Sequence, residues 1–419
     1  MGRSFQGIYQ RWILIVVSGG IMMDWSTTYF LGLDPEAFSF TKFVVVPVIL
    51  CDLMFRFTRY LNKECVVYGG LFAAGVVVCL QGPSLEEFDG ALVATKLLPN
   101  ILVLVFYSAC SRDDELLVVL RVMFFASLVV VACMVLAYFN ILAPVDYIAE
   151  GNITRITAGT SWSTLPLFLS IPASTLGGLL LMDSRKTRLR TIGIPIAAAI
   201  GLATLFAALV SGQRTSAALF ALCLVSSAVL YLSNMSWRNF LITLVVLALT
   251  LLLVQQLSGQ FTDASSTLVE RTTGSTTGDM LGNVEDRSLM YSTFFEALFT
   301  DPSIRPPGMA FFVQRAGNIP HLILGEAYCY GGLIMLFAVA FLFYRAWRND
   351  IETWLNRRKR PTENARVSLL VILLGFSLTL SFHPGLHTRM VYMVLGLSLA
   401  RHSRMILNWM PTAGAPAPR

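Results

Sequence analysis

The sequence predicts an all-α fold: a polytopic integral membrane protein with about 12 transmembrane helices and one large loop outside the membrane. First, 55% of the 419 residues are hydrophobic and only 13% are charged, whereas about 25% of the residues in a typical soluble domain are charged. Second, apolar runs of about 20 residues, the length that crosses a bilayer as a helix, recur along the chain. Third, lipid offers no hydrogen bonds to an exposed backbone, so such runs are expected to be helices.

The expected spans divide the chain into four parts. Residues 1–257 hold the first nine helices, 258–320 form the outside loop, 321–405 hold the last three helices, and 406–419 form a disordered cytoplasmic tail. The first apolar run lacks a small-residue cleavage site and is followed by many others, so we expect a span there rather than a signal peptide. The spans are expected near 12–33, 40–57, 65–82, 90–110, 116–142, 161–182, 191–212, 214–233, 238–257, 321–345, 367–383 and 387–405.

The basic residues are distributed unevenly between the two sides of the membrane. With the N-terminus inside, 22 of the 31 Lys and Arg residues fall in cytoplasmic segments. Because cytoplasmic loops are enriched in Lys and Arg, we expect both ends of the chain in the cytoplasm. The same scatter argues against nucleic acid as a partner, because nucleic-acid binding gathers basic charge on one face. The seven cysteines lie inside apolar runs or at their ends, which favours apolar packing over a disulfide framework.

The long connection at 258–320 contains one amphipathic segment. Within 285–299, the side chains of Met290, Phe294 and Leu298 recur at helical spacing and share one face. We therefore expect a helix here that lies along the membrane surface with its apolar side toward lipid.

Polar residues gather on the outside face. Arg214 lies in the motif SGQRT between two spans, Arg287 opens the amphipathic helix, and His321 begins the span after the long loop. Arginine binds phosphate oxygens with a planar fork of donors and stays charged when partly desolvated. A neutral imidazole can accept a proton from a sugar hydroxyl. These residues suit a lipid-linked phosphate or diphosphate. Each also has an ordinary interpretation: Arg214 as a helix-end arginine that reaches the headgroups, Arg287 as a solvated helix residue, and His321 as an interfacial histidine.

The segment SGQRT resembles an element of the bacterial O-antigen ligase and polysaccharide polymerase superfamily. The stretch from Arg287 through Asp301-Pro302 and Pro307-Gly308 to His321 and Gly331-Gly332-Leu333 resembles the later motifs of that family. The motif resemblance covers roughly residues 211–340, and the earlier part of the chain matches as a hydropathy profile. It implies a fold like that of type C glycosyltransferases, with a large periplasmic loop late in the chain.

The resemblance also implies roles for individual residues. Arg214 and Arg287 match arginines that hold the diphosphate of a polyprenyl-linked glycan, and His321 matches the histidine on the acceptor side. The family commonly has Asn after this histidine, where this chain has Leu322. Since the outside face has no Asp-x-Asp pair, we expect neither a metal ion nor another cofactor. Further substrate-binding residues are expected among Arg305, Arg315, Glu326, His383, His387 and Arg389, although His383 and His387 also fit an ordinary turn around Pro384-Gly385.

The function that follows is a metal-independent, inverting membrane glycosyltransferase of the bacterial inner membrane. It would polymerise polyprenyl (undecaprenyl) diphosphate-linked glycan on the periplasmic face into surface polysaccharide or exopolysaccharide. A ligase that transfers finished glycan to lipid A core uses the same donor chemistry and stays open. From another class, a polysaccharide transporter or flippase is the third alternative. Expected partners are the lipid-linked glycan, the bilayer, and a flippase and a chain-length regulator of the same pathway.

Overall fold

The computed structural model is all-helical, with no strand in the part of the chain that it describes. This result confirms the all-α part of the predicted fold class, while the 12 expected spans and the large outside loop stay predictions. The described residues are 2–26, 32, 38–61, 63–81, 90–110, 112–142, 164–182, 187–211, 214–232, 241, 245, 277–300, 306–317, 320–355, 361–381, 383 and 385–400.

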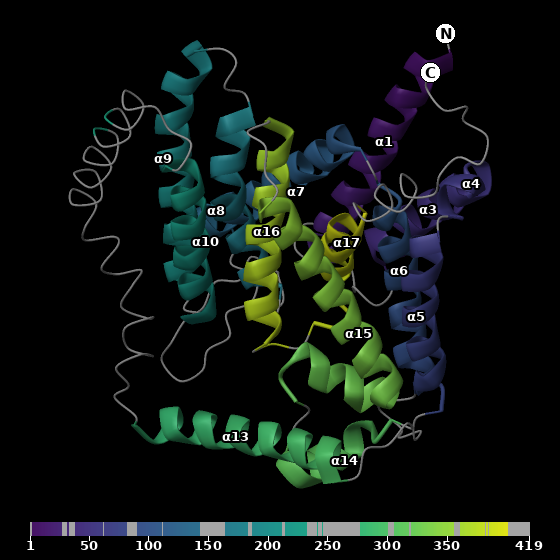
Figure 1. Ribbon diagram of the computed structural model, residues 1–419. Coiled ribbons are helices and arrows are strands. Elements are labelled where there is room, and N and C mark those ends of the chain that lie inside the picture. Colours follow the sequence, from purple (N-terminus) through teal and green to yellow (C-terminus); the bar gives the residue numbers. More distant parts are fainter. Residues whose placement is uncertain are drawn as a thin grey trace.

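Most helices stand side by side, and two lie across one end (Figure 1). The helices are α1 (Gly2–Met22), α3 (Val46–Phe55), α4 (Phe57–Tyr60), α5 (Lys63–Cys79), α6 (Gly90–Ser108), α7 (Asp113–Tyr138), α8 (Leu165–Met182), α9 (Thr187–Val210), α10 (Arg214–Leu232), α13 (Thr277–Thr300), α14 (Gly308–Ala316), α15 (Ile323–Leu355), α16 (Pro361–Leu380) and α17 (Arg389–Leu399). A π-helical turn, η1 (Thr41–Val45), precedes α3.

The two crossing helices, α13 and α14, mark what we term the α13 end of the bundle (Figure 1). The opposite end, where α1 begins, is the N-terminal end. Between the ends, α8 packs against α10 and α16, α15 against α5, and α17 against α6. Helix α17 lies at the centre of the bundle, and every side chain from Met390 to Leu399 is buried.

Two described helical segments, Asp114–Tyr138 and Ile323–Leu355, are long and apolar enough to cross a membrane, and eight shorter apolar helices accompany them. Large apolar side chains also face outward from different helices, among them Trp12 at 63%, Phe125 at 64% and Phe337 at 65% exposure. Apolar side chains on the outside of an apolar bundle suit lipid better than water. The helices therefore point to membrane association.

Several helix bounds differ from the expected spans. The first helix covers Gly2–Met22 instead of 12–33, because the chain turns at Asp24, whose carboxylate is bound by residues from two other elements. Helix α15 continues to Leu355 and bends at Gly332, whose φ of 58° and ψ of −156° are disfavoured for residues with a side chain. The expected span 238–257, apart from residues 241 and 245, and the expected tail 406–419 lie outside the described residues.

The amphipathic helix is longer than expected and packs differently. Helix α13 begins at Thr277, eight residues before the predicted start, and α14 was not predicted. The apolar face predicted to meet lipid packs on protein instead. Phe294 and Ala297 form a buried cluster with Phe312 of α14 and Tyr328 of α15, because the start of α15 offers an apolar surface at the same level of the bundle. Phe295 and Phe299 remain exposed.

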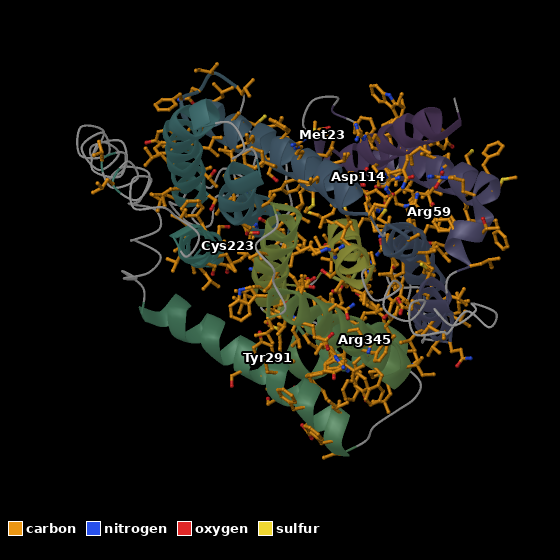
Figure 2. The ribbon with its side chains drawn as sticks, turned by 45° about the horizontal axis from the view of Figure 1, so that its top comes forward. Met23, Arg59, Asp114, Cys223, Tyr291 and Arg345 are labelled. Atoms are coloured by element: carbon orange, nitrogen blue, oxygen red, sulfur yellow. The ribbon has the colours of Figure 1, made fainter. Side chains whose placement is uncertain are left out.

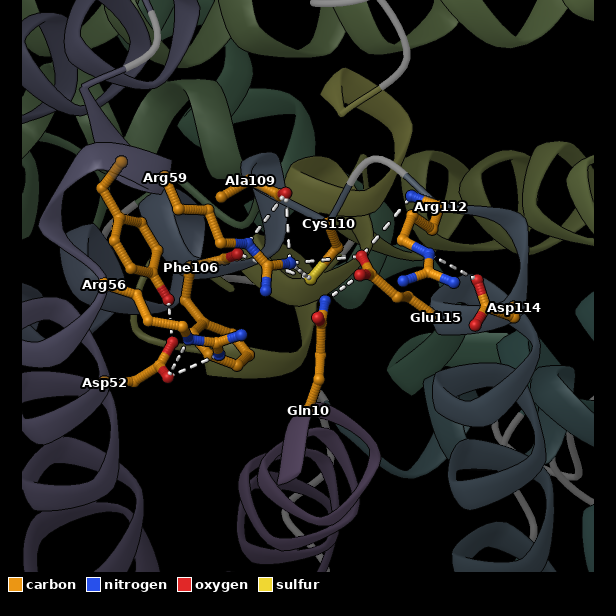
Figure 3. Close-up of polar contacts among 11 residues, drawn as sticks. Gln10, Asp52, Arg56, Arg59, Phe106, Ala109, Cys110, Arg112, Asp114 and Glu115 are labelled. Carbon is orange, nitrogen blue, oxygen red and sulfur yellow. Dashed lines mark hydrogen bonds and ion pairs between the residues drawn. The ribbon is translucent and has the colours of Figure 1, made fainter. Parts of the chain in front are cut away.

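A buried charge network joins four elements at the N-terminal end (Figure 3). The Arg59 guanidinium lies 3.2 Å from the Glu115 carboxylate and donates to the carbonyl oxygen of Ala109. Gln10 of α1 donates to the same carboxylate from its other side. Arg56 forms a second pair with buried Asp52, which also accepts a hydrogen bond from Tyr60. These contacts fix α1, α4 and the start of α7 around the end of α6.

We predict that Glu115→Ala destabilises the protein by about 3 kcal/mol, because the substitution leaves the mostly buried Arg59 without its carboxylate. Equilibrium unfolding of the purified protein in mixed detergent micelles, titrated with SDS, measures this loss. The matched control is Asp114→Ala, because Asp114 pairs with Arg112 on the same helical turn but both side chains are about half exposed. Equal losses in the two variants would contradict the role assigned to the network.

Candidate functional site

The candidate site centres on the connection between α16 and α17, residues 381–388. Helix α17 has 11 residues, which at 1.5 Å per residue amounts to about half of a bilayer's hydrocarbon thickness. The connection reaches into the bundle, because Asn100 in the middle of α6 donates a hydrogen bond of 3.1 Å to the carbonyl oxygen of Leu386. Irregular backbone at such a depth needs internal hydrogen-bond partners.

Glu326 supplies those partners. One oxygen of its buried carboxylate accepts hydrogen bonds of 2.8 Å from the backbone N–H groups of both Gly385 and Leu386. Its other oxygen lies 3.6 Å from Nε2 of His387. These two hydrogen bonds tie the backbone of the connection to α15, and the His387 ring faces the same carboxyl group.

The local sequence explains how Glu326 reaches the connection. It lies in the first turn of α15, and the preceding residue is Gly325. A Cβ atom at Gly325 would lie 2.4 Å from Cβ of Pro320. Glycine therefore allows the start of α15 to fold back closely on the segment that leads into it.

A second carboxylate holds the start of α17. The Arg389 guanidinium donates a hydrogen bond of 2.9 Å to Asp24, which follows the end of α1. The backbone N–H and the hydroxyl of Thr41 in η1 donate to the same carboxylate. Arg389 and Asp24 are mostly buried, at 23% and 17% side-chain exposure, so this pair ties α17 to the first two elements of the chain.

The connection also contacts α10 and α13. Nε2 of His383 lies 3.3 Å from the hydroxyl of Thr215, the residue after Arg214 at the start of α10. The hydroxyl of Tyr291, one turn after Arg287 on α13, donates to the carbonyl oxygen of Ser381. Figure 2 shows Tyr291 on α13, where this helix passes the bundle. The helices that carry Arg214 and Arg287 therefore meet at one connection, although the side chains of both arginines lie outside the described part.

The other predicted site residues are placed as follows. His321 is partly buried and lies two residues before α15. Arg315 is exposed on α14, and its guanidinium carbon lies 4.4 Å from the ring centroid of Phe311. Arg305 lies outside the described residues. Of the predicted substrate-binding residues, the structure thus brings together Glu326, His383, His387 and Arg389.

Sequence reasoning missed several residues of the site. Asn100 carries a signal that could have found it, because polar residues inside predicted spans mark functional positions. Asp24 stands out in the sequence as a charge inside the expected span 12–33, but its pairing with Arg389 was not predicted. Tyr291 and Thr215 carry no such signal, since a tyrosine or threonine at the end of an apolar run is common. Among the described residues, no three His, Cys, Asp or Glu side chains are grouped as metal ligands would be.

No protein-family model matches the sequence, and no curated protein matches it.

We predict that Asp24→Asn and Arg389→Gln are coupled in stability by about 1–3 kcal/mol, because each residue loses its charged partner when the other is changed. A double-mutant cycle, read by SDS unfolding, measures the coupling. The control cycle uses Arg348 and Glu352, an exposed pair on α15, for which we expect a much smaller coupling. Additive effects of Asp24→Asn and Arg389→Gln would mean that the pair does not hold α17.

Proposed function

We propose that the protein is a membrane glycosyltransferase that polymerises glycan from a polyprenyl-diphosphate-linked donor at its α13 end. The observation that supports the proposal is the convergence at residues 381–388. His383 contacts the start of α10 beside Arg214, and Ser381 accepts a hydrogen bond from α13 one turn after Arg287. The start of α10 and the middle of α13, each of which carries an arginine, thus meet beside two histidines and the buried carboxylate of Glu326.

The proposed chemistry follows from these residue types. Arg214 and Arg287 bind the diphosphate and stabilise the charge that develops on it as the bond from its oxygen to the anomeric carbon breaks. An acceptor hydroxyl attacks the same carbon and forms the new glycosidic bond, with inversion. His321 accepts the proton of that hydroxyl, and the proton then passes to the released diphosphate.

The charge distribution supports the proposed side of the membrane. Arg59 lies in α4, toward the N-terminal end of the bundle (Figure 1), and Arg56 and Arg112 lie in the same group of polar contacts (Figure 3). Cytoplasmic segments are enriched in such residues. In the proposal, therefore, the N-terminal end faces the cytoplasm and the α13 end faces the periplasm of a bacterial inner membrane. A lipid-linked donor reaches the α13 end from the outer leaflet, where the exposed Phe295 and Phe299 of α13 suit contact with lipid.

We predict that Arg214→Ala, Arg287→Ala and His321→Ala each lower glycan transfer by about 100-fold or more, because each removes a group that acts on developing charge or on the transferred proton. The assay uses the purified protein with a synthetic polyprenyl-diphosphate-linked oligosaccharide. Arg348→Ala is the control, because Arg348 is a half-exposed arginine in the second half of α15. The Arg348→Ala variant should transfer glycan at the same rate as the unchanged protein. Full transfer in all three site variants would exclude the proposed chemistry.

The same assay separates a polymerase from a ligase. Products in which several repeats are joined on one polyprenyl diphosphate indicate polymerisation. Transfer of intact glycan to added lipid A core, without joining of repeats, would identify a ligase instead.

A further inference from the structure

Three buried polar atoms beside the connection have no hydrogen-bond partner among the described residues. They are Oδ1 of Asn100, Nδ1 of His387 and Nε of Arg389. Their residues are neighbours, since Asn100 donates to the carbonyl oxygen of Leu386, His387 follows Leu386, and Arg389 begins α17. A buried polar atom without a partner costs about 1–3 kcal/mol. Few occur in native proteins, so three around one turn indicate a place built to receive a polar molecule.

The three side chains cannot easily turn to satisfy these atoms. Asn100 is held by the hydrogen bond from Nδ2 and Arg389 by the hydrogen bond from Nη1 to Asp24, and Nε2 of His387 lies 3.6 Å from Glu326. If one of these side chains rotated to give its unpaired atom a partner, it would lose the contact that it now makes. The free atoms are therefore presented in fixed positions.

Whether each unpaired atom is a hydrogen-bond donor or an acceptor determines which chemical group can bind there. We assign the ring proton of His387 to Nε2, which lies 3.6 Å from the Glu326 carboxylate, so that Nδ1 is an acceptor in the neutral ring. Oδ1 of Asn100 is also an acceptor, and Nε of Arg389 is a donor. A phosphate oxygen would find one donor and two repelling acceptors there. Hydroxyl groups, which both donate and accept, satisfy all three atoms.

The position is also within reach of a molecule from outside the bundle. The side chain of His387 is 35% exposed and that of Arg389 is 23% exposed, whereas Asn100 is fully buried. The ring of Tyr330 lies beside His387, with the ring centroids 5.7 Å apart. A molecule that contacts the exposed edges of His387 and Arg389 can therefore extend its hydroxyls toward Asn100.

We propose that Asn100, His387 and Arg389 form a subsite for the hydroxyl groups of the acceptor sugar, with Glu326 as the residue that positions His387. This inference rests on the proposed function, because it names the molecule that receives the transferred glycan. The two arginines Arg214 and Arg287 would then serve the donor, and the subsite would serve the acceptor. Donor and acceptor meet across the connection 381–388.

The subsite is tested by binding, independently of transfer. The purified protein in lipid nanodiscs is titrated by calorimetry with a panel of methyl glycosides of glucose, galactose, mannose and rhamnose. Asn100→Leu should weaken binding of the preferred glycoside about tenfold, the effect of losing one hydrogen bond to a buried group. His387→Phe, which keeps a ring but removes Nδ1, should weaken it similarly and covers the case in which Asn100→Leu fails to fold.

The matched control is Asn349→Leu. Like Asn100, Asn349 is a buried asparagine whose Nδ2 donates to a backbone carbonyl, here that of Ser398, and whose Oδ1 has no partner among the described residues. Unlike Asn100, it lies in the second half of α15, away from the connection. The Asn349→Leu substitution should leave glycoside binding unchanged. Equal weakening by Asn100→Leu and Asn349→Leu, unchanged binding in the site variants, or no binding of the panel by the unchanged protein would overturn the subsite.

Failure of the subsite and failure of the proposed function give different results. Transfer from the lipid-linked donor that persists without loss in Asn100→Leu and His387→Phe would overturn the subsite and leave the proposed function standing. Glycoside binding that depends on Asn100, in a protein that transfers nothing from the donor, would support the subsite and overturn the proposed function.

Discussion

The hydrogen bonds from the backbone of Gly385 and Leu386 to the Glu326 carboxylate are the interaction on which the rest of the site depends. A non-helical connection inside an apolar bundle leaves backbone donors without water, and each unpaired donor is costly. One buried carboxylate satisfies two of them at 2.8 Å. Because Glu326 belongs to α15, the position of α15 determines the position of the connection. His383 and His387 are part of that connection, so their positions depend on α15 as well.

Buried carboxylates hold helices together in both halves of the bundle. At the N-terminal end, Glu115 is surrounded by donors from Arg59, Gln10 and the backbone of Arg112, so this network holds helices together. At the α13 end, Glu326 and Asp24 are equally well bound, but polar atoms beside them stay unpaired in the described structure. Hydrogen-bonded charge networks add rigidity. A rigid frame with unpaired atoms at its centre is the arrangement expected of a binding site.

Much of the fold could be predicted from hydropathy alone. The apolar runs that became α5, α6, α7 and α8 agree with the predicted spans to within a few residues at each end, because burial in lipid or in the bundle selects the same residues. Pro384-Gly385 correctly indicated a break between two helices. The early end of α1 could not be predicted, because it depends on Asp24 meeting Arg389, which is 365 residues away. For the same reason, the contact of Asn100 with Leu386 and the packing of α13 on α15 had no signature in the sequence.

The account is tested most directly by measuring whether Glu326 positions the connection. In a chain without its native cysteines, Thr215→Cys and His383→Cys are introduced together and treated with a short bifunctional thiol reagent. Because the two native side chains lie 3.3 Å apart, the pair should cross-link rapidly when Glu326 is present. Cross-linking should become much slower when Glu326→Leu is added. Equal cross-linking rates with and without the Glu326 carboxylate would contradict the account.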